Sequence, residues 1–555
     1  MKFLTAHPCL TAAGTALLLR GVFVLFFLFS PFRFFHQIPG LDMETLLRFG
    51  EWGTPGNSFF FTVHRGIVFL FWKLNSGTHP VLWHVCLQSL LGACGAGMLA
   101  HIALKLFRKR SLALLAGILW ALNPVELMYE FTTLQDALVN FGIVLSFWTF
   151  LQARQKRFRF PFAFGAGAAA ALAATGRPVA VGLAAVLCFW TFYDLFRRHL
   201  PLTRFLFFGA GLLTVWLSFS AVNERVSGKF NCFFNPVPYA LSVNTSSPQG
   251  AVSEVKPSTP SHPLLTTVSK MVLRTPRLWH PVEIPENLNI YFLRNVIPFF
   301  RLPFEFLPLF AAVGMILLIT SGNWQKKEGL ILLPILSLAV FLCIREPIGR
   351  YRLLLLPWFV LLTVWLITWC STFKRRTAAA VLFCLFFGTT FFSPRPLRAA
   401  DHAAWGWALE KEAGKITPEA MIHFKQAFQL KPDTNNAISL ITRAMRTNDR
   451  AVAENTARQW MNSSGNSSLS LYYAALTAYP DHKAMKNFLS RVNTKELPPK
   501  LLFRYCLMQG DICRQNRQLD EAAQFYKSAL QLPEGTPAQR QHIQTFILTR
   551  ERKND

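Results

Sequence analysis

Long apolar segments recur through the first 400 residues, and their length constrains the fold more than any other feature of the sequence. Each one extends over roughly 17 to 25 residues, the length that an α-helix needs to cross the hydrocarbon core of a bilayer. Eleven such segments are present: 11–30, 82–104, 111–128, 134–153, 161–176, 178–195, 204–222, 298–320, 329–345, 353–370 and 377–392. The sequence therefore predicts an all-α, polytopic membrane helix bundle with about eleven spans.

Composition and charge agree with a membrane protein and exclude a wholly soluble one. Hydrophobic residues make up 52% of the 555 residues, and charged residues only 15%. The net charge is +28, but 22 of these positive charges lie before Asp401, many of them in short basic clusters between apolar segments. Clusters of this kind are typical of cytoplasmic loops. We therefore attribute the basic excess to membrane topology and expect no nucleic-acid partner.

The basic clusters fall in every second loop between the apolar segments, which orients the chain across the membrane. They lie at 105–110, 154–159, 197–204, 325–327 and 374–376. Because cytoplasmic loops carry the excess of lysine and arginine, this alternation predicts a cytoplasmic amino terminus and an extracytoplasmic carboxyl-terminal domain. The loops 31–81 and 223–297 then lie on the outer side. The first apolar segment contains Arg20 and lacks a small-residue cleavage site, so we expect it to remain as a membrane anchor.

After residue 395 the composition becomes that of a soluble helical domain, which divides the chain into a membrane domain, 1–395, and a carboxyl-terminal domain, 396–555. Two stretches of the second domain repeat alanine, aromatic and alanine at helical spacing, 102 residues or three times 34 apart: Ala420, Phe424 and Ala427, then Ala522, Tyr526 and Ala529. This pattern resembles the tetratricopeptide repeat, which implies a soluble α-solenoid of helical hairpins that binds a partner protein. A helical domain with two chance matches is the alternative.

Acidic residues gather in the loops predicted on the outer side. Asp42 and Glu44 follow the first apolar segment, where a carboxylate held at the membrane surface is a candidate base; alternatively, they only mark a helix end. Asp136 begins the fourth segment, where it could instead cap that helix and complement its dipole. Glu126 and Glu130, in the turn before it, are expected to be solvated secondary acids.

Arginines also lie in the predicted outer loops, against the usual charge bias of that side. Arg177 precedes a proline that can begin the sixth span, and its planar fork suits a lipid phosphate, although snorkelling to the headgroups is an alternative. The stretch REPIGRYR adds Arg345, Arg350 and Arg352 at the entrance to a late span. Three cations here favour an anionic partner, and anchoring to anionic headgroups is the competing interpretation.

The order of these motifs is similar to that of the GT-C membrane glycosyltransferases, especially the bacterial relatives of protein O-mannosyltransferase and of the lipid A aminoarabinose transferase. The shared order is an acid after the first span, a proline and an acid after the third, GRP between the fifth and sixth, and RYRLLLLP opening a late span. The resemblance implies an enzyme of the bacterial inner membrane. Such an enzyme transfers a sugar from a polyprenyl-phosphate carrier to an acceptor at the outer face.

The resemblance also implies roles for individual residues. Asp42 and Asp136 correspond to the family's catalytic acids in the first and second outer loops, although the second position is commonly glutamate. Arg177, Arg350 and Arg352 correspond to the arginines that face the donor phosphate. A carboxylate would take the proton of the attacking hydroxyl, and the arginines would stabilise the departing phosphate without donating a proton.

Two further features of the sequence suggest additional substrate contacts and a possible metal site. Where the family has a tyrosine and a proline-rich entry to the next helix, this chain has DMETLLRFG and FTVHRGIVFLF, so His64 and Arg65 become candidate substrate contacts. His64 could also be a structural residue of the interface. No DxD motif for a nucleotide sugar stands out, so we expect no certain cofactor, but Asp42 and Glu44 form a D-x-E pair that could bind a divalent metal.

The expected partners are therefore a polyprenyl-phosphate sugar donor, membrane lipid, an acceptor protein, lipid or glycan, and a protein bound by the helical repeats. An O-antigen ligase or polysaccharide polymerase is an alternative, because such enzymes also join many spans to helical repeats. A non-enzymatic scaffold that recruits partners through the repeats is another. An anchor needs one span, however, whereas this chain has many spans with charges gathered on one side.

Overall fold

The computed structural model describes most of the chain as helices. It describes residues 6–38, 41–44, 63–74, 80–154, 159–197, 201–227, 230, 263–280, 285, 288–302, 304, 306–323, 327–344, 349–370, 375–380, 383 and 397–554. Within these ranges every regular element is an α-helix or a short 3-10 helix. The predicted all-α class is therefore confirmed for the part of the chain that the structure describes.

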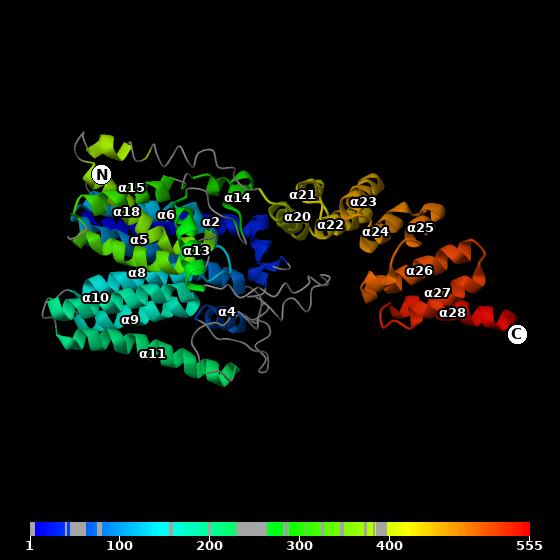
Figure 1. Cartoon of the computed structure of the whole chain (residues 1–555), viewed down its shortest axis with the longest axis horizontal. Coiled ribbons are helices and arrows are strands. Elements are labelled where there is room, and N and C mark those ends of the chain that lie inside the picture. The colour runs from blue at the N-terminus through cyan, green and yellow to red at the C-terminus, as the bar shows by residue number, and fades with distance from the viewer. Residues whose placement is uncertain are drawn as a thin grey trace. The chain divides into compact units, whose positions relative to one another are not determined.

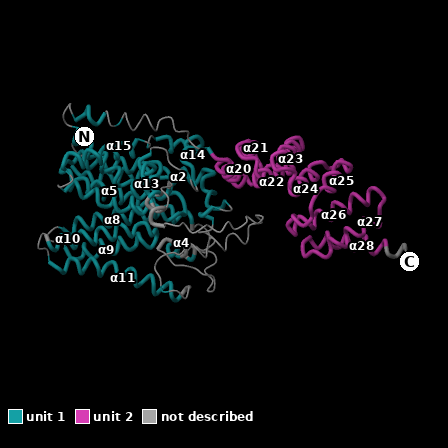
Figure 2. The backbone as a smooth tube through the Cα atoms, in the orientation of Figure 1, with its two compact units in different colours: residues 1–241, 253–397 teal, residues 242–252, 398–555 magenta. Residues whose placement is uncertain are grey.

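The chain divides into two compact units (Figure 2). Unit 1 comprises residues 1–241 and 253–397, and unit 2 comprises residues 242–252 and 398–555. Unit 1 contains the apolar helices, and unit 2 is a set of shorter, more polar helices (Figure 1).

Among the described residues of unit 1, seven helical segments are long and apolar enough to cross a membrane. They are Pro8–Leu28 (α2), Val81–Phe107 (in α5, Pro80–Phe107), Asp136–Ala153 (α8), Pro178–Phe196 (η2 and α10), Leu202–Arg225 (in α11, Leu202–Ser227), Pro298–Thr320 (η3 and α15) and Arg350–Trp369 (α17 to α18). An eighth arises if α6 (Arg110–Ala121) and α7 (Pro124–Glu130), which meet at 52°, form one bent span. This architecture is consistent with a multi-pass membrane protein.

The remaining three predicted spans do not meet this test among the described residues. The segment 161–176 forms α9 (Arg159–Gly176), whose alanine and glycine content makes it less apolar. The segment 329–345 forms η5 (Lys327–Ile331) and α16 (Leu332–Ile344), and the 13 residues of α16 are too few to cross a bilayer alone. The segment 377–392 lies mostly outside the described residues. The predicted count of eleven spans is therefore not confirmed.

Small residues explain why α9 packs closely against its neighbours. Gly167 of α9 and Gly211 of α11 face each other's helices, and a Cβ atom at either position would collide with the backbone of the opposite helix. Small residues allow this approach in membrane helices, where dispersion contacts between backbones replace the hydrophobic effect. Successive contacts link α11, α9, α8, α5 and α6, and then α18 and α15, into the bundle seen in Figure 1.

The bundle of unit 1 has two chemically different ends. Arg154 forms an ion pair with Asp194 at 3.3 Å, and Lys327 donates to the carbonyl of Lys105 at 3.1 Å, so several basic clusters meet at one end. We call this the basic end. Asp136, at the start of α8, lies at the opposite end, 17 residues or about 25 Å along the helix from its last residue. We call this the Asp136 end.

The described part of unit 2 contains nine α-helices, and each packs mainly against the helices next to it in sequence. They are α20 (Ala399–Ala413), α21 (Pro418–Leu430), α22 (Thr434–Arg446), α23 (Arg450–Ser464), α24 (Ser468–Ala478), α25 (His482–Leu489), α26 (Pro499–Gln515), α27 (Leu519–Leu530) and α28 (Pro537–Asn554). Side-chain caps begin five of them: Thr417, Asp433, Asp449, Ser467 and Asp481 each accept a hydrogen bond from a backbone N–H three residues on.

The alanine and aromatic residues of the repeated pattern form the core of unit 2. All six are at most 2% exposed: Ala420, Phe424, Ala427, Ala522, Tyr526 and Ala529. Gly510 of α26 faces Tyr526, and a Cβ atom there would lie 2.7 Å from the Tyr526 Cδ1 atom. Gly406 of α20 faces the ring of Phe424 in the same way, at 3.1 Å from its Cζ atom. The two matched stretches thus share the same contact between a glycine and the aromatic ring of the next helix.

A histidine pair joins α20 to α21. The Nδ1 atoms of His402 and His423 lie 3.0 Å apart, so one ring must donate a proton to the other. Partial burial lowers the pKa of both rings, and the charge of His402 further lowers the pKa of His423, to about 4. This contact requires at least one neutral ring.

Candidate functional site

Asp136 and Arg177 form a buried ion pair at the Asp136 end of unit 1. Arg177 lies in the turn between α9 and η2 (Pro178–Ala180), where Pro178 begins the next helical segment. Its Nε donates to Asp136 Oδ1 at 3.0 Å, and its Nη2 donates to Asp136 Oδ2 at 2.9 Å. The Asp136 side chain is fully buried and that of Arg177 is 10% exposed. Parallel bonds from the guanidinium fork hold both groups in one orientation.

A second ion pair joins Asp42 to Arg350, which are 308 residues apart in sequence. Arg350 belongs to α17 (Gly349–Arg352), and its Nη1 donates to Asp42 Oδ2 at 2.7 Å. The Arg350 side chain is 11% exposed, whereas that of Asp42 is 48% exposed. Of these two paired carboxylates, Asp42 is the one that a substrate can reach.

Tyr351 connects the two ion pairs. Nη1 of Arg177 donates to the Tyr351 hydroxyl at 3.3 Å, and the Arg177 guanidinium carbon lies 4.7 Å from the ring centroid. The guanidinium carbon of Arg350 lies 5.4 Å from the same centroid, within the range of cation–π attraction. We call Asp42, Asp136, Arg177, Arg350 and Tyr351 the Tyr351 cluster. The fold thus brings together four segments that are distant in sequence.

A side-chain hydrogen bond to the backbone holds the Asp42 turn close to the start of α8. The Thr133 hydroxyl donates to the carbonyl of Met43 at 3.2 Å, and the Met43 side chain is fully buried. The adjacent carbonyl of Thr132 accepts a 2.6 Å bond from the amide of Gln88 in α5. Asp42 therefore projects from a turn anchored on the segment that leads directly into Asp136.

Glu126 and Glu130 are buried, which corrects the expectation that they are solvated: they are 1% and 0% exposed. Glu130 accepts bonds from Arg20 Nε at 2.7 Å and from Arg20 Nη2 at 2.6 Å. Glu126 accepts from the Asn140 amide at 2.7 Å. Buried charges are retained when they have partners, and here α2 and α8 supply them.

The burial of these acids follows from how α7 begins. The Asn123 side chain accepts bonds from the backbone N–H groups of Val125 and Glu126 at 3.0 and 3.1 Å, which caps α7 where it bends away from α6. The bent helix stays inside the bundle instead of entering a solvated loop. Gly92 of α5 faces the pair formed by α7 and α2, where a Cβ atom would lie 2.6 Å from the Glu130 carboxyl carbon.

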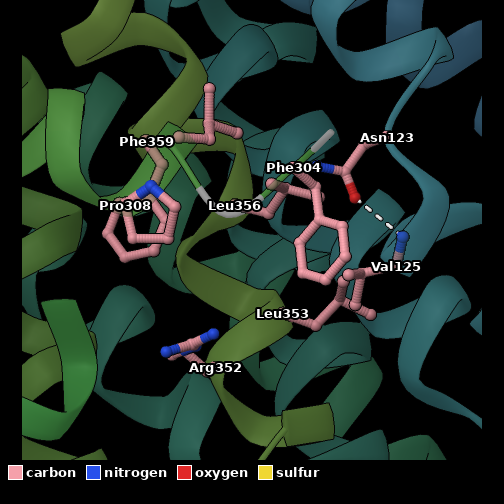
Figure 3. A pocket seen from close by; sticks show the side chains of 9 residues that line it. Asn123, Val125, Phe304, Pro308, Arg352, Leu353, Leu356 and Phe359 are labelled. Carbon is pink, nitrogen blue, oxygen red and sulfur yellow. Dashed lines mark hydrogen bonds between the residues drawn. The ribbon is translucent and has the colours of Figure 1, made fainter. Parts of the chain in front are cut away.

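Arg352, on the same short helix as Arg350, makes different contacts. It donates to the carbonyls of Arg277 and His280, which ties α17 to the end of α13 (Pro263–Trp279). It also lines a cavity of about 30 Å³, which Figure 3 shows together with Phe304 and the cap of α7. Apart from Arg352 and Asn123 its lining is apolar, and it has room for about one water molecule.

The other predicted site residues lie around the cluster or outside the described residues. Glu44 is half-buried in the same turn as Asp42. Arg65 is half-buried near the start of α4 (Val63–Leu74), which packs against α5 and α9. His64 belongs to the same helix, but its side chain lies outside the described residues, as does the whole of Arg345. Across the ranges given above, no three His, Cys, Asp or Glu side chains gather as metal ligands.

Three residues of these networks escaped prediction as site residues. Arg20 had a visible signal, because an arginine inside an apolar segment needs a buried partner. Asn140 had a weaker one, as a polar residue in the fourth apolar segment. Tyr351 had none, because a tyrosine between two arginines at a span entrance is also typical of an interfacial anchor. Its position between the two ion pairs becomes evident only in three dimensions.

Comparisons of the chain with protein-family models, with curated proteins and with solved structures gave no match. The functional argument therefore depends on the motifs of the sequence and on the geometry of the Tyr351 cluster. This cluster combines an accessible carboxylate with two guanidinium groups beside a tyrosine at the end of an apolar bundle. Chemically, it can accept a proton and bind an anion within one site.

Proposed function

We propose that the protein is an integral membrane glycosyltransferase of the GT-C type, which moves a sugar from a polyprenyl-phosphate donor to an acceptor at the outer face of the membrane. The Tyr351 cluster is the observation that supports this proposal. Its two arginines suit the phosphate of the donor, and its accessible acid suits the acceptor hydroxyl. Both lie at the end of the bundle opposite the basic clusters, which the positive-inside rule assigns to the cytoplasm.

In this proposal Arg350 and Arg177 bind the phosphate that leaves with the lipid carrier. Nη1 of Arg350 donates to Asp42 Oδ2 at 2.7 Å, and a donor phosphate that replaces this carboxylate would accept the same bond. Negative charge grows on this phosphate as the bond to the sugar breaks. Guanidinium groups that are already oriented stabilise that charge without reorganisation, which lowers the barrier.

Asp42 then acts as the general base. Its side chain is 48% exposed, so an acceptor hydroxyl can approach it. When the donor phosphate takes Arg350, the Asp42 carboxylate loses its ion-pair partner and becomes a better proton acceptor. Asp136 has a different role, because both of its oxygens are bonded to Arg177 and it is fully buried. It positions Arg177, and this pairing fits the shorter aspartate at a position that is commonly glutamate in the family.

We further propose that unit 2 is a tetratricopeptide-repeat-like solenoid, which binds an acceptor protein or a partner of the envelope machinery. The support is its packing of sequence neighbours and the matched contacts of its two repeated stretches. A divalent ion at Asp42 and Glu44 is compatible with the chemistry but is not required by it.

A complementation experiment with two matched carboxylate variants tests the proposal. A strain that lacks the protein is complemented with the wild type, with Asp42→Asn or with Glu44→Gln. We measure sugar on envelope acceptors and on the carrier lipid by mass spectrometry. Asp42→Asn should reduce transfer by about 100-fold or more, the typical contribution of a general base, and a monosaccharide should accumulate on the carrier. Glu44→Gln controls for loss of an acid from the same turn.

Two outcomes would contradict this assignment. If Asp42→Asn transfers sugar at the wild-type level, Asp42 is not the base and a scaffold function gains support. If an oligosaccharide accumulates on the carrier instead of a monosaccharide, the protein is better described as a ligase or polymerase of preassembled glycans.

A further inference from the structure

A large apolar cavity lies in unit 1, away from the Tyr351 cluster. Its volume is about 670 Å³, and it is bounded by α15 (Phe306–Thr320), by α18 (Leu356–Trp369), by residues 375–380 and by Phe383. The lining is mostly apolar and includes Phe310, Thr363, Cys370, Arg376 and Phe383. The 14 residues of α18 span about 20 Å, so the far end of the cavity lies near the basic end.

The mouth of this cavity is basic. Arg375 and Arg376 are both exposed. Nε of Arg376 donates to the carbonyl of Cys370 at 3.1 Å, which fixes the guanidinium group at the rim while its two Nη atoms have no partner among the described residues. The Arg375 guanidinium lies 5.5 Å from the centroid of the Trp369 ring. Arg376 therefore places a cation in the lining of the apolar cavity, and Arg375 places a second one next to it in sequence.

A polar group inside the cavity also lacks a partner. The Thr363 side chain is only 6% exposed, and its hydroxyl has no hydrogen-bond partner within the described parts of the chain. Threonine in a helix commonly donates to the carbonyl four residues before it, as Thr368 does to Val364 at 3.1 Å. A buried hydroxyl without a partner is costly, so we expect Thr363 to bind an acceptor other than the described residues of the chain.

We propose that this cavity binds an anionic glycerophospholipid from the membrane leaflet at the basic end. An acyl chain fills the apolar chamber, whose volume is in the range of small-molecule sites. The headgroup phosphate lies between Arg375 and Arg376, and an ester carbonyl accepts from the Thr363 hydroxyl. A basic pocket between membrane helices on the cytoplasmic side is a recognised environment for anionic headgroups.

The walls of the cavity indicate what the lipid does for the fold. Phe383 stacks on Phe310 with ring centroids 4.8 Å apart and an angle of 17° between the planes. This contact places the Phe383 ring against α15 at the wall of the cavity. A bound acyl chain would fill the space between Phe383, α15 and α18. The site is separate from the Tyr351 cluster, so the inference does not depend on the proposed function.

Native mass spectrometry of the full-length protein tests the inference. The protein is delipidated in detergent and titrated with phosphatidylglycerol or phosphatidylcholine vesicle lipid. The wild type should prefer phosphatidylglycerol by about 10- to 30-fold, as expected for two arginines near an anionic headgroup. The variant Arg375→Gln/Arg376→Gln should lose this preference. Thr363→Val, which removes only the hydroxyl, should weaken binding of both lipids by similar factors, because both contain ester carbonyls.

A matched control removes equal charge from the same end of the bundle without touching the cavity. Lys109→Gln/Arg110→Gln should keep the preference for phosphatidylglycerol, because both residues are exposed and neither lines the cavity. The inference is overturned if the wild type binds the two lipids equally, if it binds neither, or if the control loses the preference as fully as the Arg375/Arg376 variant. Should that double variant fail to fold, the single variant Arg376→Gln gives the same comparison.

Discussion

The ion pair between Arg20 and Glu130 allows a quantitative test of how unit 1 is stabilised. Both side chains are completely buried, and two bonds of 2.6 and 2.7 Å join them. Removing one partner leaves the other charge buried without compensation, which costs about 3 to 5 kcal/mol. Removing both charges leaves no uncompensated charge, so the double variant should lose less stability than either single variant. We therefore expect strong coupling between the two sites.

The assay is thermal unfolding of the purified protein in detergent, followed by tryptophan fluorescence at one fixed scan rate. Arg20→Met and Glu130→Gln should each lower the apparent Tm by roughly 4 to 6 °C, given the size of unit 1. The variant Arg20→Met/Glu130→Gln should recover part of the loss, giving a coupling free energy of about 2 to 4 kcal/mol in the double-mutant cycle. A coupling below about 0.5 kcal/mol would refute the reasoning, because independent effects mean that neither charge depends on the other.

The ion pair between Arg154 and Asp194 provides the matched control. It also joins two helices of unit 1, but its distance is 3.3 Å and Arg154 is 16% exposed. When Asp194→Asn removes its partner, Arg154 can turn toward water or headgroups, so the penalty should be about 1 kcal/mol or less. A loss as large as that of Glu130→Gln would mean that burial does not determine the cost.

Three further predictions concern other parts of the molecule. Tyr351→Phe removes the hydroxyl that Arg177 contacts but keeps the ring, so transfer activity should fall several-fold with little change in Tm. An unchanged rate of transfer would show that this hydrogen bond has no role in the reaction. In unit 2, burial keeps the folded-state pKa of His402 and His423 below the ordinary value of 6.5, so the unfolded chain binds more protons below that pH. The free energy of unfolding of unit 2 should therefore fall by about 1 to 2 kcal/mol as the pH decreases from 6.5 toward 4. The variant His402→Gln/His423→Gln should show a weaker pH dependence. Hydrogen exchange, compared at matched intrinsic exchange rates, measures both. Gly510→Ala places a methyl group against the ring of Tyr526 and should destabilise unit 2 by about 1 to 3 kcal/mol. Gly209→Ala has open space around the added methyl group and should be nearly neutral. Thermal unfolding followed by tryptophan fluorescence measures both.

Local properties of the sequence determined much of the architecture. Apolar length and charge spacing are properties of short segments, so the helical class and seven to eight candidate spans follow from them directly. The alanine and aromatic spacing in the carboxyl-terminal part likewise identified core residues of unit 2, because helical period selects one face. Span counting was less secure where alanine and glycine lower the apolar character, as in α9, or where a helix is short, as in α16.

Only the tertiary structure decided which charges meet. Asp42, Asp136, Arg177 and Arg350 could each be identified as unusual in the sequence, but the choice of partners depends on helix packing across as many as 308 residues. The misjudged glutamates show the same limit: Glu130 looks solvated until α2 brings Arg20 against it. Burial and pairing are properties of the assembled bundle, whereas helix length and polarity belong to the segment alone. This difference explains why the helices could be predicted from the sequence, whereas the contacts within the Tyr351 cluster could be identified only from the tertiary structure.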